Sequence, residues 1–146
     1  MSLPEPLPLA VPLAVPLPVI TELNIKQLQA LQTSLQGNQV LIIKFGAEWC
    51  GPCKRIAPAY QAFSQTCSAN IICADIDVDD SIELYLSLKR AKMVSSIPVF
   101  LAFFGGVKRD MWYIPDDSVI GADPLAVDKF FQRCTAFTAA NYTYFT

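Results

Sequence analysis

The feature that most constrains this chain is a pair of cysteines, Cys50 and Cys53, placed directly after a short apolar run. Residues 39–45 read QVLIIKF, a β-rich segment short enough to be a buried central strand. Residues 54–66, which follow the second cysteine, read as a helix. The cysteine pair is therefore expected where a buried strand turns into a helix.

This placement favours redox chemistry. At the start of a helix, unpaired backbone N–H groups and the helix dipole stabilise an anion. Such a site lowers the pKa of a cysteine from about 8.5 to roughly 3.5–7.5. Gly51 permits a tight backbone, and Pro52 fits the first helical turn because its missing N–H costs nothing there. Cys50 is thus predicted to attack a disulfide, and Cys53, one turn later, to resolve the product.

A zinc site and a purely structural disulfide are the two other interpretations. The chain has five cysteines and no histidine, so a zinc ion would need sulfur ligands from Cys67, Cys73 or Cys134. None of these belongs to a second C-x-x-C motif. A structural disulfide would not need a strand-to-helix junction. The redox interpretation is favoured over both, and no metal or other cofactor is expected.

Composition argues against several functional classes. A content of 53% hydrophobic and 16% charged residues argues against a disordered chain. The net charge of −2, with scattered Lys and Arg, argues against a nucleic-acid partner. No apolar run approaches the roughly 18 residues that span a bilayer, so no membrane partner is expected. The odd number of cysteines favours a reducing compartment, and the N-terminus lacks the basic start of a secretory signal, so the expected location is cytoplasmic.

The chain is predicted to have three parts: a proline-rich arm at 1–18, one domain at 19–138 and a C-terminal tail at 139–146. Six prolines between Pro4 and Pro18 oppose a helix in the arm and favour polyproline II. The arm is expected either to lie on the domain or in solution, or to dock a partner or a second copy of the chain.

The expected elements alternate between helix and strand. A capping pair, Asn24 and Gln27, starts a helix that ends at Gly37. The later elements, besides the strand and helix at the cysteines, are a strand at 70–78, a helix at 81–91, a strand at 98–104, a hairpin turn at Gly105-Gly106, a returning strand at 107–114 and a closing helix from Asp123-Pro124, with a short extra strand near 19–21. This order predicts an α/β fold whose central mixed sheet has helices on both faces.

Residues 45–58, FGAEWCGPCKRIAP, are strongly similar to the active-site segment of the thioredoxins. The shared features are the Trp before the first cysteine, Gly-Pro between the pair, a basic residue after it and a helix-kinking proline. The resemblance continues through about residues 20–135: ADIDVDD (74–80), SSIPVF (95–100), Gly105-Gly106 and Ile120-Gly121-Ala122 resemble the family's strand end, cis-proline loop, hairpin and glycine–alanine rim. The resemblance implies a thioredoxin fold with the proline-rich arm as an extension.

The resemblance also implies dithiol–disulfide exchange on disulfide-containing protein substrates. A separate thioredoxin reductase or thiol donor would then return the cysteine pair to its reduced form. Pro98 would follow a cis bond, and the Ile97 backbone would pair with the substrate. The implied docking surface consists of Trp49, Gly51, Pro52, Ile97, Gly121 and Ala122. The alternatives are a disulfide oxidase or isomerase, and an adaptor that binds partners through the arm.

The chain departs from the family pattern beside the cysteines. Lys44 stands where the family has a buried Asp, and Asp75 occupies the partner position on the next strand. The two are expected to form a buried ion pair and to be candidates for handling the Cys53 proton. A cationic Lys44 would favour the thiolate and make the protein more oxidising; alternatively, Lys44 reaches solvent and takes no part. Gly46 stands where bacterial members carry a Trp.

Five residues outside the motif carry further expectations. Cys73 is expected in the core, whereas Cys67 or Cys134 could be exposed enough to oxidise or to bridge two chains. Trp112 and Tyr113 either broaden the substrate groove or pack as strand residues, and packing is favoured.

Overall fold

The computed structural model describes residues 17–144, with side chains described through residue 140. The predicted arm therefore lies almost entirely outside the described residues. The elements are, in chain order, α2 (Ile25–Ser34), β1 (Val40–Gly46), α3 (Gly51–Thr66), β2 (Ile71–Asp77), α4 (Ile82–Arg90), β3 (Val99–Phe104), β4 (Asp117–Ile120) and α5 (Pro124–Tyr144).

The four strands form one mixed sheet in the order β2-β1-β3-β4. β1 and β2 are parallel, whereas β3 runs antiparallel to both of its neighbours. The extra strand expected near 19–21 is a single parallel bridge between Ile20 and Ala74. The Ile20 N–H donates to the Cys73 carbonyl at 2.9 Å, and the Ile20 carbonyl accepts from the Asp75 N–H at 2.8 Å. The predicted mixed sheet is confirmed.

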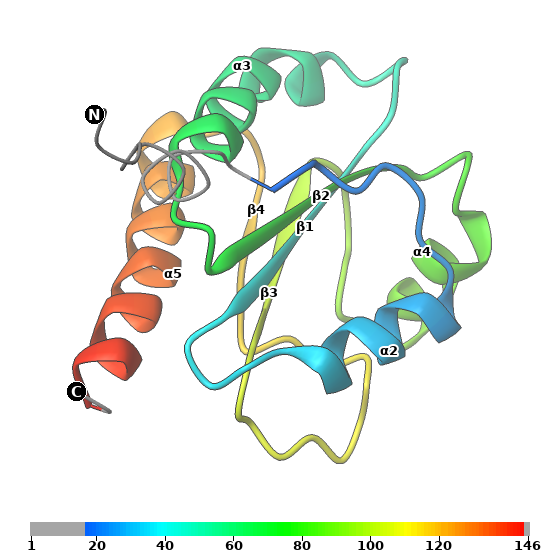
Figure 1. Ribbon diagram of the computed structural model, residues 1–146. Helices are drawn as coiled ribbons and strands as arrows, with labels where there is room; N and C mark the ends of the chain where they lie inside the picture. Colours follow the sequence, from blue (N-terminus) through cyan, green and yellow to red (C-terminus); the bar gives the residue numbers. More distant parts are fainter. Residues whose placement is uncertain (1–16, 145–146) are drawn as a thin grey trace, which may run out of the picture.

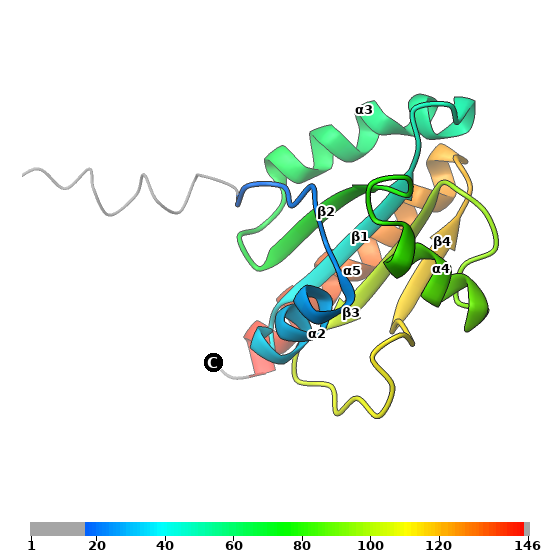
Figure 2. The same ribbon diagram turned by 90° about the vertical axis from the view of Figure 1, so that its right-hand side faces the viewer.

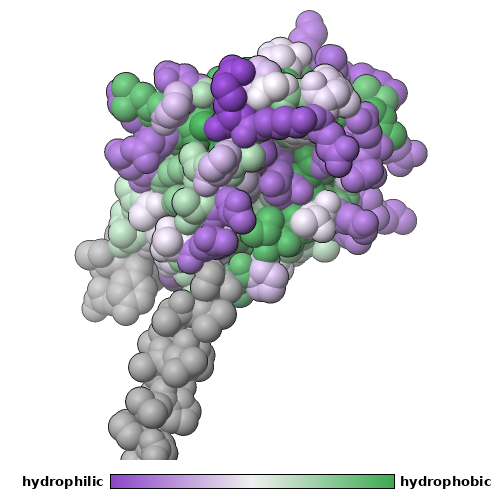
Figure 3. All heavy atoms as spheres, turned by 90° about the horizontal axis from the view of Figure 1, so that it is seen from above, coloured by the Kyte–Doolittle hydropathy of each residue, from purple (hydrophilic) through white to green (hydrophobic). Residues whose placement is uncertain are grey.

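Helices cover both faces of the sheet, as Figures 1 and 2 show. β1 is buried along its whole length. Its successive side chains point to opposite faces of the sheet, so they belong to two hydrophobic cores. The core under α2 and α4 includes Leu28, Leu41, Ile43, Phe45, Leu84 and Leu88. The core under α3 and α5 includes Val40, Ile42, Ile56, Tyr60, Phe100 and Phe130. Seen from above, hydrophobic and hydrophilic residues are interspersed on the surface (Figure 3).

The start of α2 is set by the predicted capping pair. Asn24 Oδ1 accepts from the Gln27 N–H at 2.8 Å, and Gln27 Oε1 accepts from the Asn24 N–H at 2.9 Å. The helix ends slightly before the predicted Gly37. α3 begins at Gly51, earlier than the predicted residue 54, and Pro58 lies inside it.

The prediction of a returning strand at 107–114 is wrong, because the partner of β3 is β4. Arg109 Nη1 donates to the Ile114 carbonyl at 2.8 Å, and its Nη2 pairs with Asp116 Oδ2 at 2.6 Å. The same Asp116 oxygen accepts from the Phe104 N–H at 2.7 Å. These polar contacts hold the segment between β3 and β4 as a loop, so backbone pairing with β3 resumes only at Asp116, whose N–H donates to the Ala102 carbonyl at 2.9 Å.

Two features of this loop tie it to the rest of the domain. Trp112 and Tyr113 are partly buried against the core under α2 and α4, which confirms that they pack, although they do so from a loop and not as strand residues. Gln32 Nε2 donates to the Trp112 carbonyl at 2.7 Å. At the other end, a Cβ added to Gly105 would overlap the carbonyl oxygen of Gln36, so this close approach requires glycine.

The C-terminal helix α5 continues past the predicted domain boundary at residue 138. The division into arm, domain and tail remains a prediction. Within the described part of the chain, no helix is both long and apolar enough to cross a membrane.

Candidate active site

Cys50 and Cys53 lie at the predicted junction, where β1 has ended and α3 begins, and a disulfide joins them. Cys50 is the N-cap of α3 and has an extended backbone. Its Sγ accepts from the Cys53 N–H at 3.2 Å, which occupies one of the free amide groups of the first helical turn. Both side chains are buried against the rest of the domain. The start of α3 thus places the two sulfurs where they form a disulfide bond, and it points the Cys53 N–H at Cys50 Sγ.

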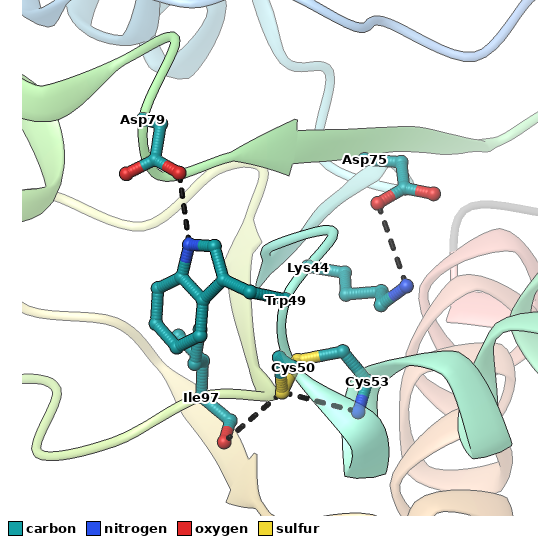
Figure 4. Close-up of a disulfide and its surroundings, with 7 residues drawn as sticks. All are labelled: Lys44, Trp49, Cys50, Cys53, Asp75, Asp79 and Ile97. Carbon is teal, nitrogen blue, oxygen red and sulfur yellow. Dashed lines mark hydrogen bonds and ion pairs between the residues drawn. A yellow bond between two sulfur atoms is a disulfide. The ribbon is translucent and has the colours of Figure 1, made fainter.

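The loop before β3 lies beside Cys50. The Ile97–Pro98 peptide bond is cis, as the resemblance implied. The Ile97 carbonyl oxygen lies 3.9 Å from Cys50 Sγ, and Figure 4 shows it pointing toward the disulfide. The Gly121 N–H donates to the Pro98 carbonyl at 2.8 Å, and Gly121 has a φ of 96°, in the region that favours glycine. The fold therefore brings the Ile97–Pro98 and Gly121 segments together with the cysteines.

Trp49 projects from the surface just before the cysteine pair, with 69% of its area exposed. Its Nε1–H donates to Asp79 Oδ2 at 2.9 Å (Figure 4). Sequence analysis did not single out Asp79. The signal was available, because the acidic segment containing Asp79 directly follows β2, and β2 ends at the same edge as its parallel neighbour β1.

The remaining predicted docking residues differ in exposure: Ile97 is partly buried and Pro98 is buried. Gly51 and Pro52 are exposed at the start of α3, and Ala122 is half-buried. Ile120, at the end of β4, is 50% exposed beside Gly121 and was also missed. Its place in the Ile120-Gly121-Ala122 segment could have indicated it. These residues add apolar surface near the disulfide.

The predicted ion pair between Lys44 and Asp75 is present. The two residues are partners in the register of β1 and β2, and Lys44 Nζ lies 3.6 Å from Asp75 Oδ1. Lys44 is only 5% exposed, so the alternative in which it reaches solvent is wrong. The Asp75 side chain is 46% exposed. Figure 4 shows the ammonium pointing toward this carboxylate. The ion pair therefore joins the buried Lys44 ammonium to a carboxylate at the protein surface.

This ion pair and Cys53 border the same cavity, which has a volume of about 420 Å³. Lys44, Gly46, Cys53 and Asp75 all line it. A Cβ placed on Gly46 would lie 3.4 Å from Cys53 Sγ and 3.6 Å from Lys44 Cε, so both side chains border the same point. Such a cavity can admit water to the resolving cysteine, and the adjacent ammonium can stabilise a sulfur anion.

The described residues hold no cluster of three or more side chains suited to a metal ion. Cys67, Cys73 and Cys134 are free thiols. Cys73 is in the core as expected and Cys67 is half-buried. Cys134 is fully buried in the core under α3 and α5, so of the two thiols that could have been exposed, Cys67 is the more accessible.

Comparisons with known proteins agree with this geometry. The family model described as Thioredoxin matches residues 22–114. The thioredoxin of Coprinus comatus is 30% identical over 113 residues, covering 77% of this chain and 96% of the fungal protein. The thioredoxin domain-containing protein 8 of Rattus norvegicus is 52% identical, but over 48 residues that cover 33% of this chain and 37% of the rat protein.

The structural comparison covers most of the domain. The crystal structure of the Malassezia sympodialis thioredoxin has a TM-score of 0.61 and 27% identity, covering 82% of this chain and 95% of that one. Together with the C-x-x-C pair, these matches support thiol–disulfide oxidoreductase chemistry. The cysteine pair at the start of α3 has the C-x-x-C spacing, and the chain belongs to the thioredoxin family and has the thioredoxin fold.

Proposed function

We propose that the chain is a protein-disulfide reductase in which Cys50 is the nucleophile and Cys53 the resolving thiol. The observation that carries the proposal is the position of Cys50 Sγ at the N-cap of α3, bonded to Cys53 and accepting its N–H. In the reduced protein, the same amide and the helix dipole stabilise a thiolate at Cys50.

The reaction is two successive exchanges. The Cys50 thiolate attacks one sulfur of a substrate disulfide, a mixed disulfide forms, and the other substrate sulfur leaves as a thiolate. Cys53, as its thiolate, then attacks Cys50 Sγ. The mixed disulfide breaks, the substrate leaves fully reduced, and the Cys50–Cys53 disulfide seen in the structure forms. Two electrons have passed from the chain to the substrate.

The proposed substrate site is the surface around Cys50. Trp49, Gly51 and Pro52 would contact an extended substrate segment on one side, while Gly121 and Ala122 would do so on the other. The Ile97 backbone would pair with the segment, and Pro98 would hold this loop against the disulfide. The proposed partners are disulfide-containing proteins and a separate thioredoxin reductase or small thiol. The free thiols are compatible with work in a reducing compartment, which we propose is the cytoplasm.

Lys44 and Asp75 are proposed to control the charge on Cys53. The aliphatic end of the buried Lys44 side chain and Cys53 Sγ border the same point beside Gly46, so the Lys44 charge would lower the free energy of a Cys53 thiolate. Asp75, exposed at the other end of the pair, would hold the ammonium in place and exchange protons with solvent. Because this effect stabilises the dithiol form, it raises the reduction potential, by about 30 mV for each ~1.4 kcal/mol.

The buried Lys44 is also the observation that favours a second candidate, a disulfide oxidase or isomerase. A potential near that of the strongly oxidising family relatives, about −120 mV, would support the oxidase, and one near −270 mV would support the reductase. Equilibration of the purified chain in glutathione buffers measures this potential.

Reduction of insulin disulfides in the presence of dithiothreitol tests the reductase itself. The wild-type chain is expected to accelerate the reaction, and Cys50→Ser to abolish the acceleration. Cys134→Ser is the matched control, because Cys134 is buried on α5, away from the disulfide. A wild-type rate equal to the background would contradict the proposal.

A separate experiment tests Lys44. Lys44→Met retains the aliphatic stem and removes the charge, so the reduction potential is expected to fall by tens of millivolts. Lys129→Met, an exposed lysine on α5, is the control and is expected to leave the potential unchanged. The double variant Lys44→Asp/Asp75→Lys should lower the potential as well while keeping an ion pair. Equal potentials in Lys44→Met and the wild type would contradict the proposed role.

A further inference from the structure

A cavity of about 350 Å³ lies between α3 and α5, which cover the same face of the sheet (Figures 1 and 2). We call it the α3–α5 groove. Two of its lining residues are aromatic: Phe63 and Phe131 stack with their ring centroids 4.2 Å apart and an interplanar angle of 9°. The other lining residues are Ala59, Ala62, Thr66, Pro124, Val127 and Asp128. Among these described residues only Asp128 is charged, so the groove is suited to an apolar occupant.

The groove is accessible from solvent. Ala59 and Ala62 are exposed on α3, Pro124 is exposed at the start of α5, and Phe63 is half-buried. A volume of this size is at the lower end of the range of ligand pockets, about 300–1,000 Å³, so it holds a few side chains. Aromatic-lined grooves are the sites that proline-rich segments bind, because polyproline II is already extended and loses little conformational entropy on binding.

The chain itself contains a segment of this chemistry. Residues 1–16 read MSLPEPLPLAVPLAVP and precede the described part of the structure. Their prolines alternate with Leu, Ala and Val, and Glu5 is the one charged side chain in the segment. Residues 6–10, PLPLA, carry no charge, so they can lie beside Asp128 without electrostatic repulsion.

The described chain begins beside α3. Val19 and Ala57 line the same small cavity on one side of this helix, and Leu17 is 43% exposed, so the preceding residues start at the surface. The α3–α5 groove is on the other side of the helix, because two successive residues turn the direction by about 200° between Ala57 and Ala59.

The length of the arm matches this path. Half the circumference of a helix about 10–12 Å in diameter is roughly 17 Å. About six residues of polyproline II, at about 3.1 Å each, cover that distance, so residues 11–16 reach from Leu17 to the groove. Residues 6–10 are the next to enter it, and five such residues span about 15 Å. The lining residues of α3, from Ala59 to Thr66, extend over about 10 Å of the helix.

We propose that residues 6–10 of the proline-rich arm occupy the α3–α5 groove of their own chain, with Leu7 and Leu9 against Phe63 and Phe131. The tether favours the same chain over a second copy, because a short linker gives an effective concentration in the millimolar range. The groove's lining residues do not include either active-site cysteine, so the proposal does not depend on the thiol–disulfide chemistry.

Nuclear Overhauser effects in the oxidised full-length chain test the contact directly. The expected result is a set of cross-peaks from the side chains of residues 6–10 to the rings of Phe63 and Phe131. Because the contact is within one chain, the cross-peaks are expected to keep their relative intensity after a tenfold dilution.

Two variants and one matched control locate the contact. Leu7→Asp/Leu9→Asp is expected to abolish the cross-peaks, because a carboxylate is not stabilised in an apolar groove beside Asp128. Ala59→Glu, at an exposed position that lines the groove, is expected to abolish them as well. Ala30→Glu makes the same change at an exposed position of α2, on the other face of the sheet, and is expected to leave them intact.

Four results would overturn the proposal. The first is a wild-type spectrum without cross-peaks between residues 6–10 and either ring. The second is contact of these residues with another surface, such as the side of α3 that carries Ala57. The third is loss of the cross-peaks on dilution, which would assign the arm to a second copy of the chain. The fourth is an equal effect of Ala59→Glu and Ala30→Glu on the cross-peaks.

Discussion

The Trp49 indole N–H donates to the Asp79 carboxylate at 2.9 Å, and this bond joins the residue before the nucleophile to the loop after β2. Trp49 is 69% exposed, so packing alone does little to fix its ring. Asp79 is held in turn, because its own N–H donates to Asp77 Oδ1 at 2.8 Å. The largest apolar side chain of the proposed substrate surface therefore depends on a polar contact from the neighbouring strand end.

Asp79→Ala is expected to weaken substrate binding with little change in the chemical step. Loss of one exposed hydrogen bond to a charged group costs about 0.5–1 kcal/mol, which corresponds to a roughly two- to fivefold rise in KM for insulin. The value of kcat should stay close to that of the wild type. Asp80→Ala changes an exposed neighbour of the same charge and controls for the loss of a carboxylate. Equal KM values for the two variants would argue against a role for the Trp49–Asp79 bond.

Asp75→Asn is expected to destabilise the fold, because it leaves the buried Lys44 ammonium without its counter-charge. Removing one partner of a fully buried pair costs several kcal/mol, but Asp75 is half exposed, so we expect a loss of about 1–2 kcal/mol. Urea unfolding of the oxidised chain, monitored by circular dichroism, measures this change. Asp110→Asn, at an exposed loop residue, is the control. If Asp75→Asn were as stable as Asp110→Asn, solvent would be enough to stabilise the Lys44 ammonium without the Asp75 carboxylate.

Two glycine substitutions should have opposite effects on stability. A Cβ at Gly46 makes ordinary contacts with Cys53 and Lys44, so Gly46→Ala is expected to stabilise the chain by about 0.4–1 kcal/mol through reduced entropy of the unfolded state. A Cβ at Gly105 would overlap the Gln36 backbone, which cannot move aside as a side chain would. Gly105→Ala is therefore expected to cost at least about 2 kcal/mol.

Urea unfolding of the two alanine variants and the wild type, all oxidised, gives this comparison directly. The same substitution in both positions keeps the change in side-chain chemistry matched. If Gly105→Ala unfolded at the wild-type urea concentration, the close approach of the Gln36 carbonyl would not be a constraint on the fold.

The sequence predicts elements well where local pattern and burial agree. The run at 39–45 is mostly apolar because β1 is covered on both faces, and the Asn24–Gln27 pair forms the cap that its spacing indicates. The strand predicted at 107–114 is wrong for a different reason. Gly105-Gly106 and the apolar residues after it match a hairpin locally, but Arg109 and Asp116 fold the segment through contacts across the loop. A local pattern does not contain those contacts.

The candidate site likewise contains features that the sequence could predict and features that it could not. The cysteine pair and the Lys44–Asp75 pair could be predicted, because a motif marks the first and alignment with the family pattern gives the second, which the strand register then places side by side. The full burial of Cys134 could not. It depends on how α5 packs over α3 and the sheet, and spacing in the sequence leaves that packing undetermined.

The alkylation rate of Cys67 is expected to depend on pH with a midpoint near 7. Below that pH the thiol is protonated and unreactive, and above it the thiolate, stabilised by the Cys73 thiol and by the Cys67 backbone N–H, reacts with iodoacetamide. Rates are measured by peptide mass spectrometry in the Cys50→Ser/Cys53→Ser chain. Adding Cys73→Ala removes the strongest stabilising contact, so the midpoint should rise toward the ordinary value of about 8.5. Adding Cys134→Ser should leave it near 7, since the thiol that lowers the Cys67 pKa is Cys73 and not the buried Cys134. A midpoint unmoved by Cys73→Ala would show that the buried thiol does not control its neighbour.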